Sequence, residues 1–180
     1  IQQAPNLPRE LRVSNFSSWG PTDDGRIKPD IMGVGTDVLS TSNATNASYT
    51  ALNGTSMSSP NVAGSMFLLQ QLYNRLNNGK FMRSATLKGL VIHTAMDFGA
   101  VGPDYQSGWG LLHAENAAKV ILNKNKSHVI RELSLNNGTI YTEKIIASGV
   151  GNIQATLSVG DQCPGLDPVR KYSRGNAQPS

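Results

Sequence analysis

The sequence lacks the features that would fix its cellular compartment or attach it to a membrane. Cys163 is its single cysteine, so it cannot form an internal disulfide and does not indicate a redox environment. No apolar run approaches the roughly 20 residues that span a bilayer, and the first residues lack the charged-then-apolar pattern of a signal peptide. We therefore expect no membrane span. Because the chain starts at Ile1 instead of Met, we expect a processed product or an excerpt.

Aromatic residues and concentrated charge are also scarce. Aromatics make up 6% of the 180 residues, and the net charge of +4 is spread thinly along the chain. Nucleic-acid binding would call for a denser basic stripe, with aromatics or a recognisable module, so we expect no nucleic-acid partner. What is present, 38% apolar residues with 18 glycines and 9 prolines, is typical of a globular, loop-rich chain.

The first half of the chain predicts a loop, two short strands and a long helix. Residues 14–30 are dense in turn formers and predict consecutive surface turns, while residues 36–41 and 49–52 have strand-like side chains. From Ser56 to about residue 76, apolar residues recur at helical spacing over a wide stripe, which predicts a helix buried on most sides. We expect Pro60 to fall in its first turn, where a missing N–H is tolerated, and Gly79 to stop it.

Two shorter helices follow, and then a β-rich end. Residues 84–94, with Ser84 as a cap, and residues 114–122 predict helices. Residues 129–135, 139–147 and 153–159 predict three strands, with an Asn-Gly hairpin signal at Asn137-Gly138.

The chain therefore divides into three expected parts. We expect a layered α/β unit over residues 1–124 and an incomplete β-rich domain over residues 125–160. Residues 161–180, which carry no periodic apolar pattern, are expected to be a disordered or non-native tail, as if the natural sequence stopped or shifted reading frame near Ser158.

The residues that carry chemistry lie in Asn53-Gly-Thr-Ser-Met-Ser-Ser-Pro-Asn-Val-Ala-Gly64, at the junction of a strand and the long helix. A serine at this point is close to unpaired helix N–H groups and to the positive end of the helix dipole, both of which stabilise a developing oxyanion. Gly54 would let a substrate backbone approach. The simpler interpretation of Ser56 is a helix N-cap.

The whole motif closely resembles the nucleophile signature of the subtilisin-like serine proteases. It lacks only the usual histidine at the position of Asn61. The resemblance runs from about residue 13 to residue 122 through Ser14-Asn-Phe-Ser-Ser-Trp-Gly-Pro21, Asp24-Gly-Arg-Ile-Lys-Pro-Asp-Ile31, and two later helical segments that start at Leu87 and Gly108. Where the family has Ala-Pro-Gly, this chain has Gly33-Val34-Gly35. The implied fold is part of a subtilisin-like α/β domain, a parallel sheet with helices on both faces, followed by the start of a small β-sandwich.

The resemblance also implies an activity and a site. Ser56 would attack a peptide carbonyl to form an acyl-enzyme, with Gly54, Thr55 and Met57 lining the substrate and oxyanion region. In the family, the Asp, the His and the oxyanion Asn all precede the serine, so here they would lie upstream of Ile1. The implied protein is a secreted or extracellular endopeptidase that acts on polypeptides, and its nucleophile-bearing part would be inactive without the N-terminal half of the catalytic domain.

The other titratable residues do not predict a second site. His93, His113 and His128 are interpreted as packing or surface residues, and their spacing predicts no metal site. Asp23-Asp24 is interpreted as a solvated turn, so we assign no metal and no cofactor, and calcium in a full-length protein stays open. The alternative function is a catalytically inactive, truncated or partner-dependent structural protein in which Ser56 is inert.

Overall fold

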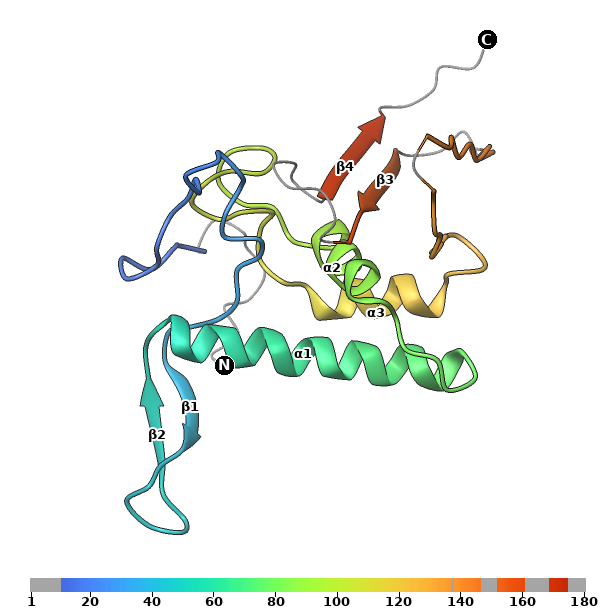
Figure 1. Ribbon diagram of the computed structural model, residues 1–180. Helices are drawn as coiled ribbons and strands as arrows, with labels where there is room; N and C mark the ends of the chain where they lie inside the picture. The colour runs from blue at the N-terminus through green and yellow to red at the C-terminus, as the bar shows by residue number, and fades with distance from the viewer. Residues whose placement is uncertain (1–10, 137, 147–151, 161–168, 175–180) are drawn as a thin grey trace.

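The computed structural model describes residues 11–136, 138–146, 152–160 and 169–174. Its elements follow in the order β1 (Val38–Thr41), β2 (Tyr49–Leu52), α1 (Thr55–Leu76), α2 (Ser84–His93), α3 (Ala114–Leu122), β3 (Ile153–Ser158) and β4 (Val169–Arg174). In Figure 1, α2 and α3 lie on one side of the long helix α1, and the β1–β2 hairpin projects from its N-terminal end. The described part of the chain is therefore a mixture of helices and strands, as the sequence predicts.

The region before α1 is built as predicted. Residues 11–37 form turns and bends apart from an isolated bridge at Met32, and the two predicted strands form an antiparallel hairpin. Its register pairs Val38 with Leu52 and Thr41 with Tyr49. This hairpin delivers the chain directly into the first turn of α1.

α1 contains 22 residues and ends as predicted. Gly79 adopts a positive φ of 78° and donates its N–H to the Asn74 carbonyl at 3.0 Å, which satisfies a carbonyl of the last turn. The expectation for Pro60 is wrong: because the helix already begins at Thr55, Pro60 lies in the second turn. Its missing N–H therefore leaves the Ser56 carbonyl without its i+4 donor.

The prediction that α1 is buried on most sides is also wrong. One face packs on α3 through Leu69 and Tyr73, which are buried. The opposite side carries Phe67 and Leu68, which are 76% and 68% exposed. We call Ala63, Gly64, Phe67 and Leu68 the outer face of α1. The apolar periodicity is real, but no described element covers this second face.

α2 and α3 match the predicted ranges closely and supply most of the core. Ser84 is the first residue of α2 and not its cap; the cap position is Arg83, which makes no side-chain capping bond. In α3 the cap is His113, whose side chain accepts a hydrogen bond from the Asn116 amide. The core cluster consists of Leu69, Tyr73, Met82, Leu90, Val91, Ala117, Val120 and Ile121.

Extended backbone also joins the loops around this core. Met32 forms a parallel bridge with Leu111, and Leu111 forms an antiparallel bridge with Met96. Within the described residues, the bridge between Met32 and Leu111 is the parallel pairing, and both two-stranded ladders are antiparallel.

The C-terminal region differs from its prediction. Residues 129–135, and residues 139–146 of the next predicted strand, are irregular, because they find no ladder partner in the described chain. Side-chain contacts tie this segment down instead: the Arg83 amide donates to Glu132 Oε1 at 2.8 Å. The predicted hairpin at Asn137-Gly138 stays a prediction, because Asn137 lies outside the described residues.

The predicted strand β3 is confirmed, and its partner is a strand that the sequence pattern does not predict. β3 pairs antiparallel with β4, which lies in residues 161–180, the part expected to lack regular structure. The expectation of a disordered tail is therefore wrong for residues 169–174, while the expectation of a non-native tail stays a prediction. β3 also packs on α2, where a Cβ built on Gly89 would lie 2.8 Å from the Ser158 Cβ. The β-sandwich and the division into domains stay predictions.

None of the helices in the described ranges is both long and apolar enough to cross a bilayer.

Candidate functional site

Ser56 stands at the exposed N-terminal end of α1. It is the second residue of the helix, after Thr55, and its side chain is exposed. The N-cap is Gly54, whose φ of 152° suits a residue without a Cβ, and no side chain caps this end. The interpretation of Ser56 as an N-cap therefore fails. Among the residues that the structure describes, its hydroxyl has no hydrogen-bond partner.

The backbone around Ser56 offers donors for an anion. The amides of Met57 and Ser58 both donate to the Gly54 carbonyl, at 3.1 and 3.3 Å. The amides of Thr55 and Ser56 have no backbone acceptor within the described ranges. Unpaired N–H groups in the first turn, together with the positive end of the dipole of a 22-residue helix, create a region that favours negative charge. An oxyanion forming beside Ser56 would be stabilised there.

The other predicted site residues are neighbours of Ser56 in this turn. Thr55 is exposed, and Met57 is half-buried. The Met57 sulfur lies 3.7 Å from the point where a Cβ on Gly54 would stand, so the thioether covers Gly54 on one side. The structure thus places all four predicted residues, Gly54 to Met57, around one exposed backbone turn.

A preceding loop supports this turn. We call residues 31–35 the supporting segment. The Gly54 amide donates to the Gly35 carbonyl at 2.8 Å, and just beyond the segment the Asp37 amide donates to Asn53 Oδ1 at 2.6 Å. A Cβ on Gly35 would lie 2.8 Å from the Gly54 carbonyl oxygen and 3.1 Å from the Ser58 Cβ, so only glycine fits.

Substitution of Gly35 is therefore expected to displace the turn that carries Ser56. We expect Gly35→Ala to lower the free energy of unfolding by about 1–3 kcal/mol, because the atom that must move is backbone. Gly64→Ala is the matched control: a Cβ there has open space, and the change should stabilise the helix by up to about 1 kcal/mol. Urea unfolding measures the free energy of unfolding of both variants. Equal changes in the two would contradict a specific role of Gly35 in supporting the turn.

The three histidines lie in other surroundings. His93 Nδ1 is 2.9 Å from Thr156 Oγ1, at the contact between α2 and β3. His113 Nδ1 accepts the Asn116 amide at 3.2 Å, which makes His113 a helix cap. Histidine is not among the preferred capping residues, so sequence alone gave no signal for this role. The His128 amide donates to the Asn123 carbonyl at 3.1 Å, at the end of α3.

The acidic turn has partners of its own. The Thr22 hydroxyl and Arg26 Nε both donate to the Asp24 carboxylate, the latter at 2.8 Å. The hydrogen bond from Thr22, followed by that from Arg26, lowers the pKa of Asp24 to about 2. Within the described ranges, no three His, Cys, Asp or Glu residues group in a way that could hold a metal ion.

A hollow of about 770 Å³ lies elsewhere on the surface. It is lined by residues of two loops, 11–13 and 98–107, among them Arg12, Phe98 and Asp104. Asp104 Oδ1 is already occupied by the amides of Gln106 and Ser107, at 2.8 and 2.6 Å. No lining residue belongs to the Asn53–Gly64 motif, so this hollow is separate from the turn that carries Ser56.

A sequence profile described as the subtilase family matches residues 8–110. A C5a peptidase of Streptococcus pyogenes is 56% identical over 62 residues, which cover 34% of this chain and 5% of that protein. A PII-type proteinase of Lactococcus lactis subsp. cremoris is 42% identical over 83 residues, 46% of this chain and 4% of that protein. The chain thus matches only a small part of the length of these relatives.

A solved structure shares part of this fold. The CspB protease of Clostridium perfringens superposes with a TM-score of 0.58 at 28% identity. The match covers 65% of this chain and 25% of that one. This likeness confirms the partial α/β fold that the sequence predicts.

Proposed function

This chain belongs to the subtilase family, and from that membership we propose that it carries the nucleophile, Ser56, of a secreted serine endopeptidase. The observation that supports the proposal is the position of Ser56: an exposed hydroxyl in the first turn of α1, beside two amides without backbone acceptors in the described chain. A nucleophile and an anion-stabilising backbone at one point are what acyl transfer requires. The relatives include proteins named as a peptidase and a proteinase.

In the proposed reaction, Ser56 Oγ attacks the carbonyl carbon of a peptide bond while a histidine base takes its proton. The carbonyl oxygen becomes an oxyanion, which the backbone beside Thr55 and Ser56 stabilises together with an asparagine side chain. The C–N bond then breaks, the protonated histidine gives its proton to the leaving amine, and water hydrolyses the acyl-enzyme. Gly54 provides room for the substrate backbone, and Met57 packs beside the nucleophile.

The proposal assigns the missing groups to a partner segment. The histidine, the aspartate that orients it and the oxyanion asparagine would come from the N-terminal half of the catalytic domain. Residues 1–124 would complete that domain, and residues 125–160 would begin a separate β-rich one. The outer face of α1 supports the assignment, since Phe67 and Leu68 present an apolar surface that the described chain leaves uncovered.

The test is hydrolysis of a fluorogenic peptide by a parent protein that includes the upstream half. Ser56→Ala should lower kcat by about 10⁶-fold, the loss measured for the same change in subtilisin, a member of this family. Ser59→Ala is the control, because Ser59 is an exposed serine in the next turn of α1. The activity of this variant should stay near that of the unchanged protein. Activity that survives Ser56→Ala would favour the alternative, a structural protein with an inert serine.

A further inference from the structure

We propose that Asp30 is a positioning residue for Ser56: its ion pairs fix the supporting segment, residues 31–35, on which the first turn of α1 rests. This inference rests on the proposed function only in calling Ser56 the nucleophile. The mechanical link from Asp30 to the turn stands on contacts within the described chain.

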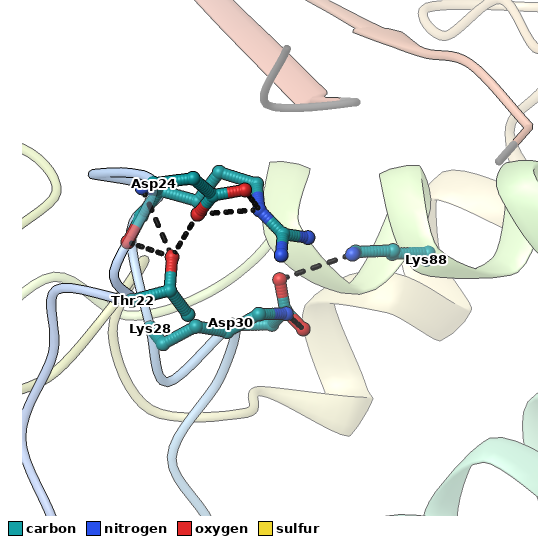
Figure 2. A network of polar contacts seen from close by, with 6 residues as sticks. Thr22, Asp24, Lys28, Asp30 and Lys88 are labelled. Atoms are coloured by element: carbon teal, nitrogen blue, oxygen red, sulfur yellow. Dashed lines mark hydrogen bonds and ion pairs between the residues drawn. The ribbon is translucent and has the colours of Figure 1, made fainter. Parts of the chain in front are cut away.

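Asp30 lies between two lysines from different elements. Lys88 comes from α2, and its Nζ lies 3.0 Å from Asp30 Oδ1; Lys28, from the same loop as Asp30, donates to Oδ2 (Figure 2). The Asp30 side chain is 34% exposed, so water screens these contacts only in part. Lys88 therefore anchors the loop to a helix whose residues Leu90 and Val91 are in the core.

The titration of Asp30 is consistent with this anchoring. Burial raises the pKa of Asp30, but the hydrogen bonds and charges of Lys28 and Lys88 outweigh it and bring the pKa below its ordinary value. The carboxylate is thus ionised, and the pairs are complete, at neutral pH. The stabilisation is present above the unfolded-state pKa of about 4 and is lost as the pH falls through the lower folded pKa.

The backbone next to Asp30 is fixed as well. The Trp109 amide donates to the Asp30 carbonyl at 3.2 Å, and the Met32 amide donates to the Gly110 carbonyl at 2.9 Å. The Leu112 amide then donates to the Met32 carbonyl at 2.9 Å. A Cβ on Gly108 would overlap the Pro29 carbonyl oxygen, so the two backbones touch directly. These backbone contacts and the Asp30 ion pairs together leave residues 30–32 little freedom to shift.

The far end of the supporting segment touches the turn itself. A Cβ on Gly33 would lie 2.5 Å from a Val62 methyl and 2.9 Å from Ser58 Oγ, and the Gly35 carbonyl accepts the Gly54 amide. The segment therefore has one fixed end at Asp30 and one end in contact with the residues that bracket Ser56. Loss of the Asp30 pairs would leave the first end held by its backbone hydrogen bonds alone, and this looser end would let the second end move more often.

Asp24 provides a matched control within the same loop. It is also an ion-paired carboxylate, bonded to Arg26 and Thr22, and appears beside the Asp30 pairs in Figure 2. Unlike Asp30, it lies in the hairpin-like turn of residues 22–26, where the Thr22 amide donates to the Arg26 carbonyl at 3.2 Å. A general effect of removing a charge from this loop should appear when either Asp24 or Asp30 is neutralised. A positioning effect on the turn of Ser56 should appear only when Asp30 is neutralised.

The experiment is residue-resolved hydrogen exchange on this chain, for Asp30→Asn, Lys88→Met and Asp24→Asn. We expect the first two to speed exchange of the Gly54, Met57 and Ser58 amides about tenfold, equivalent to about 1.4 kcal/mol of local stability. Exchange of Ala117, Val120 and Ile121 in α3 should not change, and Asp24→Asn should leave both groups of amides unaltered. Asp30→Glu, which keeps the charge, should restore most of the protection.

Three results would overturn the inference: unchanged exchange at residues 54–58, equal acceleration in Asp24→Asn, or a uniform increase that includes α3. The readout does not involve catalysis, so it is separate from the test of Ser56. In the parent protein, Asp30→Asn should lower kcat at near-constant KM, because the nucleophile moves while substrate contacts elsewhere remain. A change in KM alone would contradict positioning.

Discussion

A fluorophosphonate probe is expected to label Ser56 in this 180-residue chain about 10⁶-fold more slowly than in a parent protein that supplies the upstream histidine and aspartate. The hydroxyl is exposed and the backbone donors are in place, but no described group accepts its proton. A neutral serine is a weak nucleophile, so geometry alone does not activate it. The factor of about 10⁶ is the loss of kcat known for removal of the serine or the histidine in subtilisin.

The measurement is intact-mass analysis over time, with Ser56→Ala as the blank. Addition of the separately expressed N-terminal half should restore rapid labelling if the two parts associate. Stoichiometric labelling of the chain alone within the time needed by an active protease would show that the base lies in these 180 residues.

The second large effect is expected on the outer face of α1. Leu68→Asp should change the free energy of unfolding of this chain by no more than about 0.5 kcal/mol, because Leu68 is 68% exposed. In the parent protein, the same carboxylate would be buried against apolar groups, at a cost of several kcal/mol. We therefore expect loss of binding to the N-terminal half and loss of activity.

Leu122→Asp is the control, since Leu122 is another exposed leucine, 56% accessible, on α3. Association can be followed by size-exclusion chromatography of the two halves. The N-terminal half is the proposed occupant of the outer face because this chain covers 25% of the CspB protease that it resembles. Equal loss of binding in both variants, or unimpaired binding of Leu68→Asp, would mean that something else covers the outer face.

Most of the local structure was predictable from sequence because its signals are local. The periodicity of Leu69 and Tyr73 predicts α1, Gly79 predicts its end, and β-branched residues predict β1 and β2. The same reasoning placed Ser56 at a helix start. Periodicity reports which residues are apolar and not what covers them, so it does not predict the exposure of Phe67.

The failures concern contacts between distant residues. Residues 129–135 have strand-like side chains but no partner strand, and strand propensity without a partner does not make a ladder. β4 forms in a segment without a periodic pattern because β3 offers it an edge. The Asp30–Lys88 pair joins a loop to a later helix, and nothing in either local sequence indicates the other.

The packing of β3 against α2 also orders the events of folding. His93 and Thr156, which touch, are 63 positions apart, whereas the contacts among α1, α2 and α3 need nothing beyond residue 122. During synthesis the three helices can pack before β3 exists, and β3 must then close a long loop whose entropic cost grows with the logarithm of its length. Until then the α2 surface around Gly89 stays open to water, and its closure by Ser158 is the last long-range step that involves the three helices.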